Sequence, residues 1–300
     1  MCVTCGCGTN LGAKLSLHSS NSADKAFSSA PASNRGIRFR AVGTHTHNHA
    51  HQHEVAQSDT LRVPGRDTET MQLEKQILGK NQLLAEKNRQ WLSERGILAL
   101  NLMSSPGAGK TTLLERTITD LLSTIPITVI EGDQETANDA ERIRAAGARA
   151  VQVNVGSGCH LEADMLERAM ALVNPEADSL LLIENVGNLV CPALFDLGER
   201  AKVVIFSVTE GEEKPLKYPH MFSVADVMLL SKIDLMPHLR FNLDLAINNA
   251  ISINPALKIF PVSSYTGEGL EAWYSWLRTQ FKNADVKNTA LLNSAVANAV

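Results

Sequence analysis

The chain has 300 residues, of which 44% are hydrophobic, and its 28 basic and 32 acidic residues give a net charge of −4. This weakly acidic balance lacks the basic footprint of a protein that binds nucleic acid or an anionic membrane. The chain contains no run of about 18 apolar residues and no secretory signal pattern, so we expect a cytoplasmic protein without a membrane span.

Residues 1–66 are rich in Ser, Asn, Gly, Thr and His and show no hydrophobic periodicity, which predicts a disordered tail. Cys2, Cys5 and Cys7 form C-x-x-C-x-C at its start. Three thiolates and the terminal amine are a soft donor set that suits Ni²⁺, and redox pairing of Cys2 with Cys5 is the alternative. Five alternating histidines are expected to buffer Ni²⁺, Zn²⁺ or Cu²⁺ without selecting one: His45, His47, His49, His51 and His53.

The tail is followed by an expected helix, within residues 67–95, in which Leu73, Ile77, Leu84 and Trp91 recur at helical spacing before Gly96. We expect this helix to pack on the domain, with partner binding as the alternative. From residue 97, short apolar segments alternate with amphipathic ones. Strands are predicted near 97–103, 126–131, 150–155, 179–184, 202–208, 226–231 and 257–262. Helices are predicted near 111–124, 134–146, 161–173, 239–252 and 268–282.

Alternating buried strands and amphipathic helices predict an α/β domain over residues 67–285, with a mostly parallel sheet covered by helices on both faces. Residues 286–300 are small and polar, which is typical of a flexible C-terminal tail.

The first predicted strand leads into Ser104-Ser105-Pro106-Gly107-Ala108-Gly109-Lys110-Thr111-Thr112. A strand, a Gly-rich turn, Gly-Lys-Thr and a helix are the context of a phosphate loop, as in P-loop NTPases. We expect the nucleotide to bind at Gly107, Ala108, Gly109, Lys110, Thr111 and Thr112. Lys110 would supply charge to the phosphates and Thr111 a hydroxyl to Mg²⁺. Ser104 replaces the first Gly of the usual motif.

Later segments fit the order of motifs in a G protein, which predicts GTP as the nucleotide. Glu184-Asn185-Val186-Gly187 resembles D-x-x-G, and Ser231-Lys232-Ile233-Asp234 resembles N-K-x-D, in which Lys232 and Asp234 would bind the base. Ser263 begins a segment similar to the last base-contacting loop. Asp133, at a strand end, is expected to bind Mg²⁺ together with Thr111 and Glu184, and a helix N-cap is its alternative role. We assign catalysis to Lys110, Asp133 and Glu184, and no residue to orienting the attacking water.

A second candidate metal site uses Cys159, His160 and Cys191, which follow two predicted strands. Two thiolates and an imidazole suit Ni²⁺ or Zn²⁺, and three ligands leave a position that a second subunit could fill. The alternative is two buried structural cysteines and a surface histidine.

Several segments together resemble the HypB family of nickel-incorporation GTPases of [NiFe]-hydrogenase maturation. The matching segments are residues 2–7, 104–112, 131–134, 158–161, 184–192 and 207–219, including Asn188-Leu189-Val190-Cys191-Pro192. The resemblance implies a dimerising GTPase that delivers nickel to the precursor of the hydrogenase large subunit, with a HypA-type nickel chaperone as partner. It also implies a tight nickel site at the N-terminal cysteines, and a weaker Ni²⁺ or Zn²⁺ site at Cys159, His160 and Cys191 near the dimer interface.

Two functions fit these features. The first is a switch in which GTP promotes a dimer and reshapes the inner metal site, and hydrolysis resets it with release of the metal. The second is a nickel store that uses the nucleotide domain as a docking platform. A related GTPase that serves another metalloenzyme, such as urease or a cobalamin enzyme, is a further reading, and a small-molecule kinase is the last.

Overall fold

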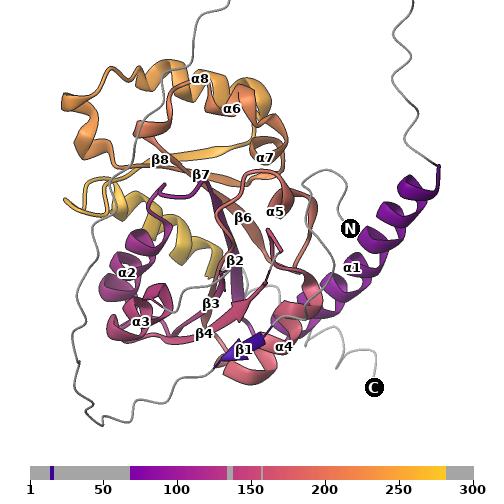
Figure 1. The fold of residues 1–300 in the computed structure, drawn as a ribbon. Coiled ribbons are helices and arrows are strands. Elements are labelled where there is room, and N and C mark those ends of the chain that lie inside the picture. The colour runs from indigo at the N-terminus through magenta and orange to yellow at the C-terminus, as the bar shows by residue number, and fades with distance from the viewer. Residues whose placement is uncertain (1–13, 17–67, 134–137, 157, 282–300) are drawn as a thin grey trace, which may run out of the picture. The chain divides into compact units, whose positions relative to one another are not determined.

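A computed structural model describes residues 14–16, 68–133, 138–156 and 158–281 (Figure 1). Both predicted tail sites, the cysteine motif at residues 2–7 and the histidines at residues 45–53, lie outside the described residues. The predicted C-terminal tail, 286–300, lies outside them too.

Eight described strands form one sheet in the order β1-β4-β3-β5-β2-β6-β7-β8. Their bounds are β1 Lys14–Ser16, β2 Leu98–Ser104, β3 Ile127–Asp133, β4 Arg149–Asn154, β5 Leu180–Glu184, β6 Ala201–Ser207, β7 Val227–Ser231 and β8 Lys258–Pro261. Strands β2 to β8 are parallel, which confirms the predicted parallel sheet. The antiparallel β1 is an addition, because the sequence analysis placed no element in residues 1–66.

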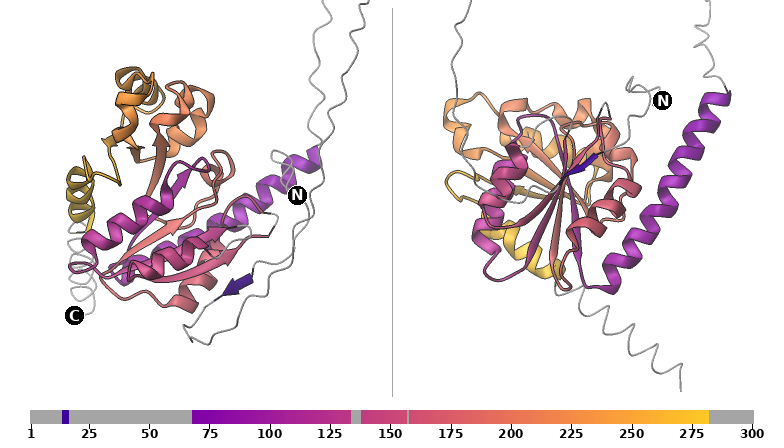
Figure 2. Two further views of the ribbon diagram at one scale, coloured as in Figure 1. Left: turned by 60° about the vertical axis from the view of Figure 1, so that its left-hand side comes forward. Right: turned by 60° about the horizontal axis from the view of Figure 1, so that its bottom comes forward.

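The helices cover both faces of this sheet (Figure 2). Their bounds are α1 Thr68–Glu94, α2 Lys110–Leu121, α3 Asn138–Ala145, α4 Ala163–Val173, α5 Cys191–Leu194, α6 Lys214–Lys217, α7 Pro219–Val224 and α8 Leu243–Ile253, followed by a helix over residues 270–281. Helices α2, α3 and 270–281 share one apolar cluster with the sheet, whereas α1 and α4 share another. A third cluster joins α7 and α8 to β6 and β7.

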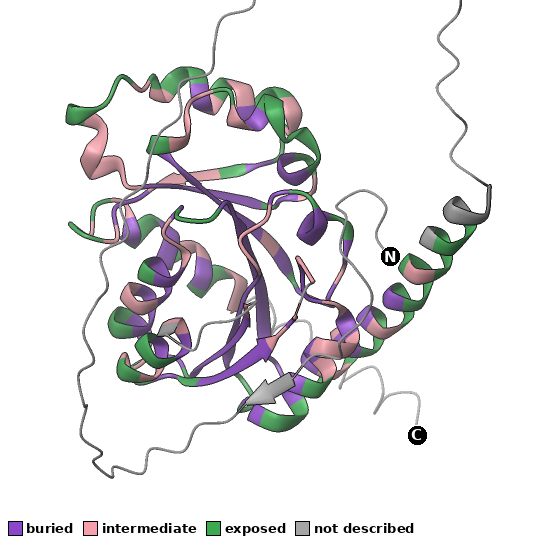
Figure 3. Ribbon diagram, in the orientation of Figure 1, coloured by how far each residue is buried: buried purple, intermediate pink, exposed green. Residues whose placement is uncertain are grey.

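The central strands β2, β5 and β7 are buried along their whole length, which is why they read as continuous apolar runs (Figure 3). The predicted helix at 239–252 begins later, at Leu243, because the Asn242 side chain accepts a hydrogen bond from Leu245 N and caps α8 there. The short helices α5, α6 and α7 were not predicted. None of the described helices is long and apolar enough to cross a membrane.

The predicted apolar stripe of α1 is confirmed in part: Ile77, Leu84 and Trp91 are half-buried, and Trp91 packs against the core, whereas Leu73 is 49% exposed. The residues most buried in the described part of α1 are Asn81, Ala85, Asn88 and Leu92. The two asparagines tolerate burial because their amides donate to backbone carbonyls of the domain, Asn81 to Asp196 O at 2.7 Å and Asn88 to Ala163 O at 2.8 Å. The C-terminal half of α1 therefore packs on the domain as expected, but through a stripe that begins with polar residues.

Candidate functional site

The connection from β2 to α2 has the geometry of a phosphate loop. Gly109 caps α2 with φ 97°, a left-handed conformation that favours glycine, and Gly107 has φ 73°. Ser104 is the buried last residue of β2, and its hydroxyl accepts a hydrogen bond from Lys110 Nζ at 2.9 Å. Since Ser104 has no left-handed φ, the serine in place of the first glycine costs no backbone strain.

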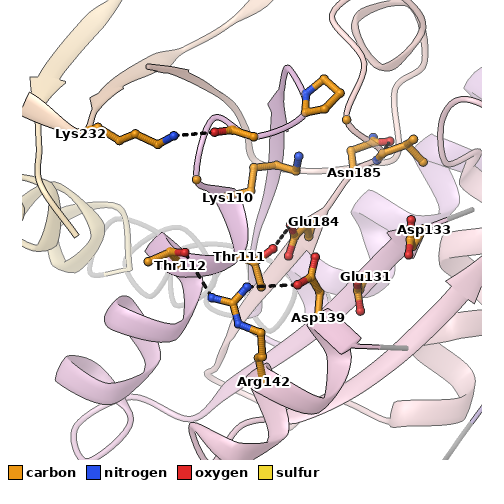
Figure 4. A pocket seen from close by; sticks show the side chains of 16 residues that line it. Lys110, Thr111, Thr112, Glu131, Asp133, Asp139, Arg142, Glu184, Asn185 and Lys232 are labelled. Carbon is orange, nitrogen blue, oxygen red and sulfur yellow. Dashed lines mark hydrogen bonds and ion pairs between the residues drawn. The ribbon is translucent and has the colours of Figure 1, made fainter. Parts of the chain in front are cut away.

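A cavity of about 540 Å³ opens beside this loop (Figure 4). It gathers most of the predicted phosphate and magnesium residues from the ends of β2, β3, β5 and β7. Its lining comprises Pro106, Gly107, Gly109, Lys110, Thr111, Thr112, Glu131, Gly132, Asp133, Asp139, Arg142, Glu184, Asn185, Val186, Gly187 and Lys232. The cavity is thus lined by both basic and acidic side chains, which suits a phosphate chain with a divalent cation.

The oxygen atoms at one wall of this cavity fit Mg²⁺. Thr111 Oγ1 donates to Glu184 Oε1 at 2.9 Å, and Asp133 lines the same cavity. Glu184 Oε2 is buried and has no hydrogen-bond partner within the described residues. Burial raises the pKa of Glu184 to about 7, against the opposing effects of Lys110 and Thr111. Carboxylate and hydroxyl oxygens are the donors that Mg²⁺ prefers, and a cation would stabilise the ionised form of Glu184.

Glu131 is a second buried carboxyl in the cavity that the sequence analysis missed. It lies beside Glu184 in the β3–β5 register, is 2% exposed, and its Oε2 lacks a partner among the residues described. Burial, followed by the negative charge of Glu184, raises the pKa of Glu131 to about 8. The available signal was a carboxylate inside a strand that is otherwise apolar up to that point, Ile127-Thr128-Val129-Ile130-Glu131.

The base-reading segments are anchored to the phosphate loop. Lys232, with φ 62°, donates from Nζ to Gly107 O at 2.7 Å, and Ser231 Oγ donates to Ala108 O at 2.7 Å. Ser231, which replaces the Asn of the N-K-x-D motif, therefore holds this segment to the phosphate loop through its hydroxyl group.

Two predicted base-binding residues come together at the ends of β7 and β8. Ser263 Oγ donates to Asp234 Oδ1 at 2.6 Å, and Asp234 lines a separate cavity of about 530 Å³ with Thr266 and Glu268. A carboxylate held in this way can accept hydrogen bonds from a base that offers two neighbouring N–H donors, as guanine does.

The predicted inner metal ligands also converge. Sulfur or nitrogen atoms of Cys159, His160 and Cys191 lie within 4.8 Å of one another, and Cys159 Sγ is 3.6 Å from His160 Nδ1. Cys191 is fully buried and begins α5, whereas Cys159 is half-buried in the loop after β4. The alternative prediction, in which His160 lies on the surface, is wrong, because His160 is only 8% exposed.

The surroundings of His160 keep it in the form that binds metals. Its ring packs against Phe195 with centroids 4.0 Å apart, and burial lowers the pKa of His160 to about 4. A neutral imidazole has a free lone pair for a metal ion. Its Nε2 is buried with no hydrogen-bond partner in the described part of the chain, and it lies 3.8 Å from Glu162 Oε1. Two thiols and a neutral imidazole suit Ni²⁺ or Zn²⁺.

Known proteins resemble this chain both in the nucleotide-binding domain and over most of its length. Residues 98–261 match the family model described as CobW/HypB/UreG, nucleotide-binding domain. The hydrogenase maturation factor HypB of Escherichia coli K12 is 46% identical over 288 residues, which cover 93% of this chain and 99% of that protein. The chain belongs to the HypB family of hydrogenase maturation factors. HypB of Rhizobium leguminosarum bv. viciae is 58% identical over 218 residues, covering 72% of this chain and 73% of that protein.

Solved structures of HypB proteins share the fold. HypB from Helicobacter pylori in complex with nickel has a TM-score of 0.64 and 38% identity, covering 68% of this chain and 96% of that chain. HypB from Archaeoglobus fulgidus has a TM-score of 0.63 and 41% identity, covering 68% of this chain and all of that chain. The predicted family and P-loop fold are thereby confirmed.

Proposed function

We propose that this HypB-family chain is a GTP-hydrolysing nickel chaperone that inserts Ni²⁺ into the precursor of the large subunit of a [NiFe]-hydrogenase. The observation that carries the proposal is the convergence of Cys159, His160 and Cys191 on loops that leave the same sheet edge as the phosphate cavity. The nickel bound in the Helicobacter pylori relative supports nickel as the cargo, and Zn²⁺ is a second metal that the same donors accept.

The cavity residues divide the work of phosphoryl transfer. In the phosphate cavity, Lys110 would bind the phosphate chain, and Thr111, Asp133 and Glu184 would hold Mg²⁺. Asp234, which lines the separate cavity, would read the base of GTP. Mg²⁺ would neutralise the charge that develops on the phosphates. Hydrolysis needs positioning and charge stabilisation more than covalent chemistry, so these residues can support it without a nucleophile of their own.

GTP binding would favour a homodimer, and hydrolysis would reset the metal site and release nickel. Three protein ligands leave one position open at Cys159, His160 and Cys191, which a second subunit or an incoming partner can occupy. The partners of this cycle are a HypA-type nickel chaperone and the hydrogenase precursor, and the compartment is the cytoplasm. The tail ligands at residues 2–7 and 45–53 would hold further nickel.

The test is the Lys110→Ala variant, measured for GTP hydrolysis and for hydrogenase activity in cells that lack the native chain. Lys110 would bind the phosphates, so its loss should abolish both activities. It is not one of the three candidate nickel ligands, so nickel binding at Cys159, His160 and Cys191 should persist. Full hydrogenase activity in a variant that no longer hydrolyses GTP would refute the switching role. Arg168→Ala, which removes an exposed i,i+4 ion pair with Asp164, is the control and should change neither activity.

A further inference from the structure

The segment that follows β5 touches both the phosphate cavity and the metal-ligand loop. Asn185 comes directly after Glu184, lines the cavity and is 1% exposed. Its backbone N–H is tied to the strand before the phosphate loop by a 3.0 Å hydrogen bond to Leu102 O. Two residues further on, a Cβ placed on Gly187 would lie 3.2 Å from Pro106 of the phosphate loop, so the two loops are in close contact.

The Asn185 side chain points the other way, to the loop that carries Cys159 and His160. Its Oδ1 accepts hydrogen bonds from Leu161 N at 3.1 Å and from Val186 N at 3.0 Å. Two backbone N–H donors fix the oxygen of the amide on this side, so the orientation of the amide follows from its partners. One side chain therefore holds the peptide group that joins His160 to Leu161.

The Leu161 side chain is also packed against β3. Leu161 is fully buried, and a Cβ placed on Gly132 would lie only 2.7 Å from Leu161 Cγ. Gly132 lies between Glu131 and Asp133 and lines the phosphate cavity. Leu161 is thus packed against one cavity segment and hydrogen-bonded to another.

We infer that Asn185 is a positioning residue that links occupation of the phosphate cavity to the geometry of the Cys159–His160 ligands. A shift of the strand ends that bind nucleotide and cation moves Asn185, and through the Leu161 N–H it moves the adjacent imidazole. Because the segment after β5 continues to Cys191, the same shift acts on all three metal ligands. This inference rests on the proposed function in one respect, namely that nucleotide controls the metal site.

The chain offers a matched control on the same loop. Asn81 Oδ1 accepts from Ala163 N at 2.8 Å, two residues beyond Leu161, and Asn81 is 6% exposed. Asn81 belongs to α1 and does not line the phosphate cavity. Replacing either asparagine with alanine removes one buried amide from the loop, but of the two only Asn185 also lines the phosphate cavity.

The experiment uses the full chain with Cys2, Cys5 and Cys7 replaced by Ser, so that Cys159 and Cys191 are the remaining thiols among its five cysteines. Ni²⁺ is titrated with GDP and with a non-hydrolysable GTP analogue, and the thiolate-to-nickel absorption reports this site. In this background we expect the two nickel affinities to differ by at least about fivefold. Asn185→Ala should bring the two affinities to within about twofold, whereas Asn81→Ala should preserve the difference.

A full nucleotide effect in folded Asn185→Ala would overturn the inference and leave the proposed function standing. If the two nickel affinities are already equal in the background that retains Asn185, both the inference and nucleotide control of the metal site are overturned. GTP hydrolysis and nickel binding would not be affected by that result. If Asn185→Ala does not fold, the inference is tested instead by backbone amide hydrogen exchange in the chain that retains Asn185. The exchange rate of Leu161 N–H should then differ between GDP and the analogue by at least about fivefold, while that of Ala163 N–H stays constant. Equal responses of the two amides would refute the link.

Discussion

Replacing Glu131 with Gln should stabilise the nucleotide-free protein, and the gain should grow with pH. The pKa of Glu131 rises from 4.5 to about 8 on folding, first because of burial and then because of Glu184. Between these values the folded chain holds a proton that the unfolded chain releases, so wild-type stability falls as pH rises through this window. Each pH unit is worth about 1.4 kcal/mol, which gives about 3 kcal/mol at pH 7 and under about 1 kcal/mol at pH 5. Gln keeps the shape of the protonated acid without this cost.

The assay is denaturant unfolding of wild type and Glu131→Gln without nucleotide or divalent cation, at pH values from 5 to 8. Glu141→Gln is the matched control, because Glu141 is exposed on the neighbouring helix α3 and its change should stay within about 0.5 kcal/mol. A stability difference for Glu131→Gln that does not vary with pH would refute the reasoning, since it would mean that Glu131 folds without retaining a proton.

Three further predictions address the loop and the metal ligands. Cys191→Ser should weaken nickel binding in the tail-cysteine-free background at least about tenfold, read by competition with a chelator, because a soft thiolate ligand is lost. Gly109→Ala should lower the free energy of unfolding by about 1 kcal/mol or more, since φ 97° is unfavourable for alanine, and urea denaturation checks this. For His160, whose pKa is lowered from 6.5 to about 4, the metal-free protein should lose stability as pH falls from 6.5 to 4, because only the unfolded imidazole gains a proton there. In His160→Gln the fall should be smaller by about 1.4 kcal/mol per pH unit, measured by the same denaturation.

The sequence predicted the strands and the phosphate loop because both depend on local information. A buried parallel strand is apolar along most of its length, and the left-handed turn at Gly109 favours glycine. Two buried residues that line the phosphate cavity, Glu131 and Asn185, were given no role for the opposite reason. A polar residue near a strand end resembles the start of an exposed loop, and only the three-dimensional structure shows that these two are buried.

The buried asparagines of α1 were missed for a related reason. Hydrophobic spacing predicted a stripe through Leu73, but the buried face begins with Asn81 and includes Asn88. Their amides are satisfied by carbonyls more than 70 residues away in the chain, on the loops around Ala163 and Asp196. A partner at such a separation leaves no periodic trace in the sequence, so polar residues that are buried because they are bonded cannot be recognised from spacing alone.

The order of the strands explains why the candidate nucleotide and metal residues lie close together in this domain. Strand β5 lies between β3 and β2, so its carboxyl end adjoins both the phosphate loop and the Glu131–Asp133 segment. The chain then continues from Glu184 through Asn185 to Cys191, and the loop after β4 brings His160 to the same place. A cation bound by Glu184 would therefore act at the start of the segment that leads to Cys191, a candidate nickel ligand. This arrangement separates two classes of substitution: loss of Cys191 should weaken nickel with either nucleotide bound, whereas loss of Asn185 should remove the difference between the two nucleotides.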